Sequence, residues 1–162
     1  MPERTAHARW QGDLRGGSGV MELGSGAFKG DYTFASRFES GAGTNPEELI
    51  GAAEAGCFSM AFANALSKAG HVPQEISTTA VVSLGQEGAG FKIQRIELRT
   101  EGTVAGIDEG TFQKIAEEAK QTCPVSQALS ATQITLRVTL KAGARAGEPA
   151  VWRRPGFRSS SA

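Results

Sequence analysis

The stretch that decides the fold runs from residue 45 to residue 68 and reads NPEELIGAAEAGCFSMAFANALSK. Asn45 is a good helix N-cap, Pro46 suits the first helical position, and Glu48 stands three residues after the cap, as in a capping box. Beyond Glu54 no charged residue occurs until the last position of the stretch. Because a helix that is apolar nearly all round is a buried one, we expect this helix to form the centre of the fold.

Composition narrows the class of protein. The chain has 162 residues, with 17 basic and 17 acidic side chains and a formal net charge of zero, which suits about one domain. A generic nucleic-acid or anionic-membrane binder carries a basic excess, so neither partner is expected. No apolar run approaches the roughly 18 residues of a membrane-spanning helix, and the polar residues 1–7 hold no signal-peptide core. We therefore expect a cytoplasmic protein with no membrane and no nucleic-acid partner.

Alternating stretches before and after the helix predict strands. Residues 8–12, 20–23 and 32–39 indicate a meander of three strands with glycine-rich turns. Residues 76–84 and 91–100 indicate two further strands, connected by the glycine-rich segment 85–90. The alternation slips between residues 93 and 96, which indicates a β-bulge or a local twist.

The last third of the domain predicts two more helices and a strand. Asp108 can cap a helix in which residues 112, 115, 116 and 119 are apolar, and Pro124 can begin a shorter helix with Cys123 at its N-cap. Residues 134–140 alternate as a final strand. From residue 142 the periodicity ends, and four arginines stand against one glutamate. We expect one domain over 1–141 and a flexible basic tail over 142–162.

The two cysteines are too few for a disulfide scaffold, and a buried cysteine is commonly an inert hydrophobe. At a helix N-cap, Cys123 would be favoured as a thiolate. Cys57 lies deep inside its helix among apolar neighbours, so burial is expected to raise its thiol pKa. To react, Cys57 needs a cation delivered by the tertiary structure. Arg37 or one of the later strand arginines could supply it, although Arg37 could equally be an ordinary solvated strand charge.

Two separate motifs carry a family resemblance. Residues 44–53, TNPEELIGAA, lead to CFSM at 57–60, and CPVSQ follows at 123–127. Over roughly residues 7 to 141 the chain resembles the osmotically inducible protein C and organic hydroperoxide resistance (OsmC/Ohr) family, and the OsmC branch in particular. The resemblance implies an α+β fold with two antiparallel sheets around central helices in an intertwined homodimer.

The same resemblance implies a thiol-dependent peroxidase that reduces organic hydroperoxides and hydrogen peroxide, without cofactor or metal. Cys57 matches the peroxidatic cysteine and Cys123 the resolving cysteine. Arg37 matches the arginine that stabilises the thiolate, and Glu47 the carboxylate that orients this arginine; Arg15 in the first hairpin is the second candidate for the arginine. A dithiol reductant of the lipoyl or thioredoxin type is expected to reduce the disulfide.

Spacing adds a hypothesis about assembly. Glu47 and Cys57 are ten residues apart on one helix, about 15 Å along its axis. One arginine therefore does not readily reach both within a single chain, and we expect a homodimer whose active sites combine residues of two subunits. The alternative function is a non-enzymatic, stress-related binding protein that has an apolar cleft and inert cysteines.

Overall fold

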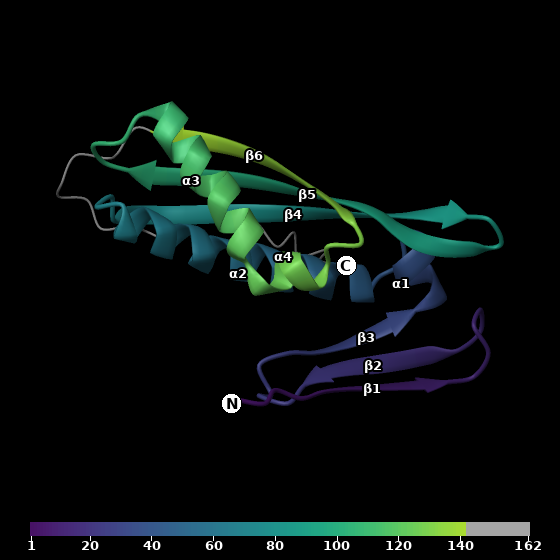
Figure 1. The fold of residues 1–162 in the computed structure, drawn as a ribbon. Helices are drawn as coiled ribbons and strands as arrows, with labels where there is room; N and C mark the ends of the chain where they lie inside the picture. The colour runs from purple at the N-terminus through teal and green to yellow at the C-terminus, as the bar shows by residue number, and fades with distance from the viewer. Residues whose placement is uncertain (142–162) are drawn as a thin grey trace, which may run out of the picture.

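The computed structural model describes residues 1–141, and the predicted tail, 142–162, lies outside the described residues. Figure 1 shows the elements in chain order. They are β1 (Ala6–Gln11), β2 (Ser18–Leu23), β3 (Lys29–Thr33), α1 (Phe34–Phe38), α2 (Pro46–Lys68), β4 (Pro73–Glu87), β5 (Gly90–Val104), α3 (Glu109–Thr122), α4 (Pro124–Ala128) and β6 (Gln133–Lys141). The α+β fold class expected from the sequence is confirmed.

The first sheet is the predicted antiparallel meander, in the order β1-β2-β3. The strand predicted over 32–39 is wrong beyond Thr33, because β3 ends there and α1 follows directly. Thr33 Oγ1 accepts a hydrogen bond from the backbone N–H of Ser36, and Ser36 Oγ accepts one from the N–H of Thr33. This reciprocal cap starts a helix where the alternation alone predicted a strand, and it places Arg37 on α1.

The second sheet has the order β4-β5-β6 and is mixed, which corrects the expectation of two antiparallel sheets. β4 and β5 form a long antiparallel hairpin, with a turn at residues 88–89 in place of the longer connection predicted. β6 runs parallel to β5 because the chain returns through α3 and α4, the kind of crossover that parallel pairing needs. Gln94 is the extra residue of a β-bulge, since Ser83 pairs with Arg95 and Leu84 with Ile93; this confirms the predicted irregularity.

One face of α2 builds the core. Phe58, Phe62 and Leu66 recur at helical spacing and are fully buried. The ring of Phe62 lies 4.9 Å from that of Phe112 on α3 and 5.7 Å from that of Phe58. The other buried apolar residues of the core come from β5, α3 and the segment after α3, and are Ile96, Leu98, Val104, Ile115, Ala116, Ala119 and Cys123.

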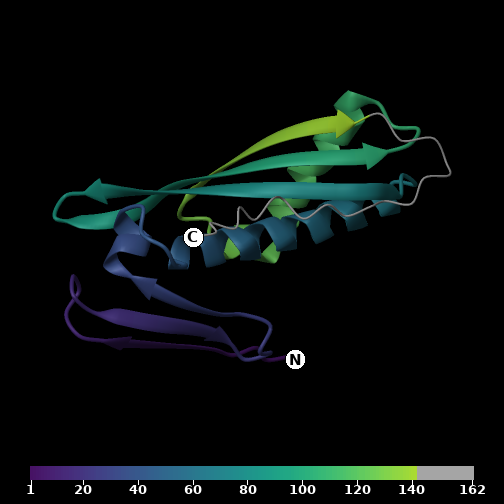
Figure 2. The same cartoon turned by 180° about the vertical axis from the view of Figure 1, so that it is seen from behind.

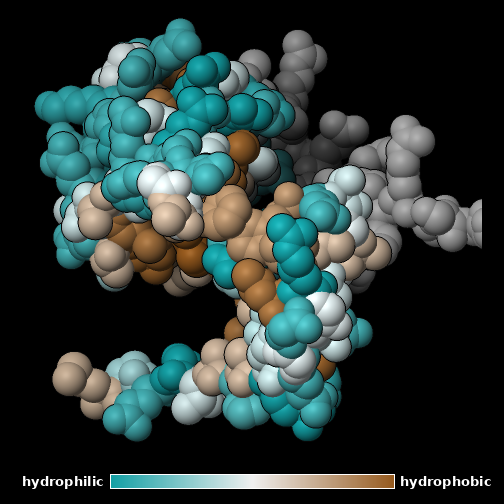
Figure 3. Space-filling model, turned by 90° about the vertical axis from the view of Figure 1, so that its right-hand side faces the viewer, coloured by the Kyte–Doolittle hydropathy of each residue, from teal (hydrophilic) through white to brown (hydrophobic). Residues whose placement is uncertain are grey.

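The opposite face of α2 is open. By length and composition α2 could cross a membrane, which corrects the expectation that no stretch of the chain is long and apolar enough, and 28% of its 18-residue apolar stretch is buried. Met60 is 77% exposed, and Ala52, Ala53 and Gly56 are also exposed. The first sheet stands apart from α2 and the second sheet (Figures 1 and 2). Figure 3 shows a wide opening between the two parts, bordered by hydrophobic surface. Within residues 1–141, no other element covers this surface.

We expect Phe62→Ala to lower the free energy of unfolding by about 3–5 kcal/mol, since it leaves a cavity between α2 and α3. Urea denaturation at a fixed protein concentration measures the change. Val72→Ala is the control, because Val72 is 72% exposed and such surface changes stay within about 0.5 kcal/mol. Equal effects of the two substitutions would contradict this assignment of the core.

Candidate active site

The two cysteine side chains meet. The Cys123 thiol donates a hydrogen bond to Cys57, with 2.9 Å between the two Sγ atoms, and both cysteines are free. Cys57 is half-buried in the middle of α2, and Cys123 is fully buried. Residues 66 positions apart in the chain are thus brought within reach of a disulfide.

The position of Cys123 is determined by the junction between α3 and α4. This residue is the C-cap of α3, where its N–H donates to the carbonyl of Ala119, and the N-cap of α4, whose first residue is Pro124. The proline suits the first position of a helix but has no N–H to continue the previous one. The chain therefore bends at Cys123, and this bend directs the side chain toward α2.

The surroundings of Cys57 disfavour its thiolate. Burial raises the pKa of the Cys57 thiol, and the hydrogen bond from the Cys123 side chain raises it further. The backbone N–H of Val125 lowers this pKa, whereas the charge of Glu54 adds to the increase. The rise expected from the sequence is confirmed, and no cation is among the groups that shift this pKa.

Cys57 borders an open groove of about 750 Å³. The groove follows α2 toward its C-terminus and is closed on one side by the α3–α4 junction. Its lining residues are Cys57, Met60, Ala61, Asn64, Ala65, Lys68, Thr122 and Pro124. A small molecule can therefore approach the Cys57 sulfur without opening the core.

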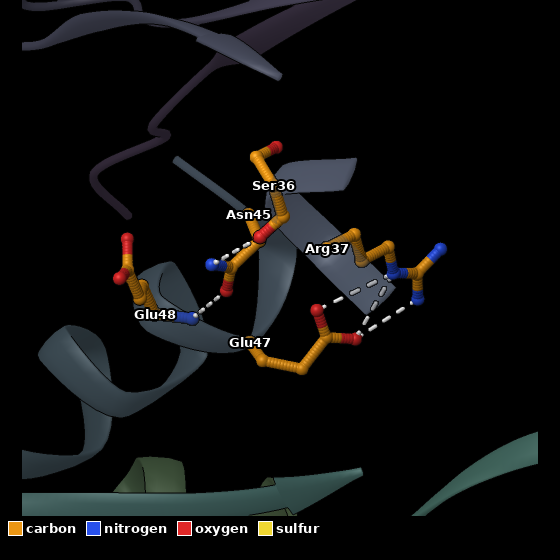
Figure 4. A network of polar contacts seen from close by, with 5 residues as sticks. All are labelled: Ser36, Arg37, Asn45, Glu47 and Glu48. Carbon is orange, nitrogen blue, oxygen red and sulfur yellow. Dashed lines mark hydrogen bonds and ion pairs between the residues drawn. The ribbon is translucent and has the colours of Figure 1, made fainter. Parts of the chain in front are cut away.

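Arg37 and Glu47 form an ion pair at the other end of α2 (Figure 4). Arg37 Nη2 donates to Glu47 Oε1 at 2.9 Å, and Nε lies 3.3 Å from both carboxylate oxygens. The Glu47 side chain is 10% exposed and that of Arg37 36%. A nearly bidentate contact of this kind fixes the plane of the guanidinium. Among the described residues, Arg37 Nη1 has no hydrogen-bond acceptor.

The local sequence explains the position of this pair. Asn45 Oδ1 accepts from the N–H of Glu48, which caps α2, while Asn45 Nδ2 donates to the carbonyl of Ser36 on α1 (Figure 4). Asn45 therefore ties the start of α2 to α1, so that Glu47 faces Arg37. A cavity of about 560 Å³ lies beside the pair, between α1, α2 and β4.

The four site residues expected from the sequence thus lie in two places. Cys57 and Cys123 are together, Arg37 and Glu47 are together, and within residues 1–141 no hydrogen bond or ion pair connects the two sets. Arg15, the second candidate for the arginine, stacks on the ring of Phe34 at 5.0 Å. No cluster of three or more metal-ligating side chains occurs in this part of the chain.

Sequence reasoning missed a polar contact beside the cysteines. Glu54 is fully buried on α2, and its Oε1 accepts a hydrogen bond from Ser126 Oγ on α4. The signal was present, because Glu54 is the lone acid within the apolar part of the helix, three residues before Cys57. Ser126 likewise stands three residues after Cys123.

Comparison with known proteins identifies relatives of this chain. The model of the family described as OsmC-like protein matches residues 39–139. The chain is 50% identical to Peroxiredoxin OsmC of Escherichia coli (strain K12) over 139 residues, which are 85% of this chain and 96% of that protein. It is 40% identical to the organic hydroperoxide resistance protein of Xanthomonas axonopodis pv. citri (strain 306), over 62% of this chain and 67% of that protein.

A solved structure supports the fold. The organic hydroperoxide resistance protein OhrB of Bacillus subtilis superposes with a TM-score of 0.60 at 24% identity, covering 85% of this chain and 98% of that chain. The family match, the identity to the E. coli protein and the shared fold lead to one conclusion: the chain belongs to the OsmC-like protein family.

Proposed function

We propose that this protein is a thiol-dependent peroxidase that reduces organic hydroperoxides, with Cys57 as the peroxidatic and Cys123 as the resolving cysteine. The observation that carries the proposal is the 2.9 Å contact between the two free thiols at the edge of an open groove. The names of the two relatives, a peroxiredoxin and a hydroperoxide resistance protein, support the same activity.

The chemistry needs only these two sulfurs and a reductant. The Cys57 thiolate attacks the distal oxygen of the hydroperoxide, the O–O bond breaks, and the alkoxide leaves and takes up a proton to become an alcohol. Cys57 is then a sulfenic acid. The Cys123 sulfur attacks the Cys57 sulfur, the S–S bond forms, and the sulfenic hydroxyl leaves as water with the thiol proton. A dithiol of the lipoyl or thioredoxin type reduces the disulfide and is itself oxidised. No resident cofactor or metal takes part in this scheme.

Arg37 is the cation we assign to Cys57, with Glu47 as the residue that orients it. Arginine stays charged in a partly buried site and can contact a carboxylate and a thiolate together. The ion pair leaves Nη1 of Arg37 free for such a contact within the described residues. Since Arg37 lies beside the first turn of α2 and Cys57 in its middle, we propose that Arg37 acts on the Cys57 of a second subunit.

A homodimer also covers the open face of α2. The small exposed residues Ala52, Ala53 and Gly56 let another backbone approach closely, and a Cβ added at Gly56 would meet nothing within 4 Å. A second copy accounts for this surface better than a membrane does, because the other face of α2 packs on β4, α3 and α4 and contains the buried Glu54. We propose an intertwined homodimer with composite sites. We also propose a cytoplasmic location, because two cysteines are too few for the disulfide frameworks of small secreted domains.

Substitution of the cysteines separates the two steps. Cys57→Ser is expected to abolish the consumption of cumene hydroperoxide, because no other thiolate faces the groove. Cys123→Ser is expected to consume one equivalent and then stop at the sulfenic acid. Intact-protein mass spectrometry with a sulfenate trap measures both outcomes. Unchanged free-thiol masses in the peroxide-treated wild type would contradict the peroxidase.

The pH dependence of the first step tests Arg37. Only the thiolate reacts, so the rate rises with pH through the pKa of Cys57. Arg37→Met removes a favourable positive charge and is expected to raise this pKa. The rate at neutral pH then falls about tenfold, and the loss shrinks as the pH rises. Arg15→Met is the matched control and should leave the profile in place; the reverse pattern would make Arg15 the activating residue.

Mixed dimers test the composite site. Arg37→Met chains, whose homodimer is slow at neutral pH, and Cys57→Ser chains, whose homodimer is inactive, are co-expressed with different tags and the heterodimer is purified. If Arg37 acts across the interface, the Cys57 of the first chain meets the Arg37 of the second, and one of the two sites regains wild-type activity. A heterodimer as slow as the Arg37→Met homodimer would place Arg37 and Cys57 of one chain in the same site.

A further inference from the structure

A second contact joins the two helices that bear the cysteines. Glu54 lies three residues before Cys57 on α2, and Ser126 lies three residues after Cys123 on α4. Residues three apart share one face of a helix. The bond between Ser126 and Glu54 therefore runs beside the contact between the two thiols.

A buried carboxyl such as that of Glu54 is an unusual group at this position. It is 0% exposed, Ser126 is 6% exposed, and within residues 1–141 Glu54 makes no ion pair. Its Oε2 has no hydrogen-bond partner among the described residues. Burial of a carboxyl with a single hydroxyl partner is unfavourable compared with an apolar side chain of similar size. Its presence next to a reactive thiol points to a role in the reaction.

The position of Cys123 depends on α4, and α4 makes few polar contacts besides the Ser126–Glu54 hydrogen bond. This helix is five residues long, and its backbone N–H at Val125 contacts the Cys57 sulfur, while the Val125 side chain packs on the core. Apart from the contacts to the thiol sulfurs, the Ser126–Glu54 bond is the polar contact that connects α2 and α4 in the described chain. An apolar contact permits sliding, whereas a hydrogen bond to a buried carboxyl defines a distance and a direction.

We propose that Glu54 and Ser126 are a positioning pair, which holds α4 against α2 so that the Cys123 sulfur stays within reach of oxidised Cys57. This role of the pair rests on the proposed peroxidase function. In the resolving step the Cys57–Cys123 bond forms and the sulfenic hydroxyl leaves as water with the Cys123 proton. Neither Glu54 nor Ser126 gains or loses a bond in this step, and both act by keeping the two sulfurs aligned.

Four variants test the pair in the full chain: Ser126→Ala, Glu54→Leu, the double variant, and Glu54→Gln. The first measurement is the rate at which the sulfenic acid becomes a disulfide after one equivalent of cumene hydroperoxide, followed by rapid quench and mass spectrometry. Each of the first two substitutions is expected to slow this step about tenfold, with sulfenic-acid formation in Ser126→Ala at the wild-type rate. The double variant should be no slower than either single one.

Glu54→Gln is the matched control. It removes the same charge as Glu54→Leu but keeps an oxygen that accepts from Ser126, so the disulfide should form at nearly the wild-type rate. Ser130→Ala, an exposed hydroxyl just beyond α4, should change nothing. Single variants that resolve within twofold of wild type, or effects that multiply in the double variant, would overturn the pair.

A second measurement keeps this test independent of the peroxidase activity. The equilibrium between the dithiol and the Cys57–Cys123 disulfide is measured in mixtures of reduced and oxidised dithiothreitol, by alkylation and mass spectrometry. Ser126→Ala is expected to lower the equilibrium constant for the disulfide about tenfold, whereas Glu54→Gln leaves it nearly unchanged. If wild-type protein forms no sulfenic acid but this pattern holds, the peroxidase proposal fails and the pair stands. Equal constants in all variants would overturn the pair.

Discussion

The packing of one face of α2 against the second sheet and α3 is the constraint on which the remaining structure depends. Phe58, Phe62 and Leu66 turn inward and are fully buried. Because they determine the rotation of the helix, Cys57 lies at the boundary between core and groove, half-buried and within reach of the α3–α4 junction. A rotation of α2 by one residue would move the sulfur by about 100° and separate it from Cys123.

The same placement leaves the Cys57 thiol without a neighbouring cation within residues 1–141. Burial and neighbouring groups raise the pKa of the Cys57 thiol, while Arg37 is held by Glu47 near the start of the helix. An arginine whose guanidinium plane is fixed by one carboxylate can still contact a second anion through its remaining N–H groups. In the homodimer that we propose, a second copy of the chain covers the open apolar face of α2 and also brings a cation to the thiol. In the mechanism proposed, assembly and activation of the cysteine are one event.

Sequence reasoning succeeded where the signals are local. The caps at Asn45, Asp108 and Cys123 set helix starts that the structure confirms, and the slip after Ile93 indicated the bulge at Gln94. It was wrong where two local signals compete, since the Thr33–Ser36 cap prevails over the alternation that predicted a strand. The parallel direction of β6 was missed because it depends on the path of the crossover. The Glu54–Ser126 contact was missed because its residues are 72 positions apart.

The amino-acid sequence by itself determined the elements, the apolar central helix and the two cysteines, together with the family resemblance that pairs them. These depend on caps, periodicity and motifs that act within a few residues. Only the tertiary structure decided which groups surround each sulfur: the thiol contact, the Arg37–Glu47 pair held apart from it, and a carboxyl buried beside it. Such contacts depend on the angle and rotation at which helices pack, and these are set by the whole core.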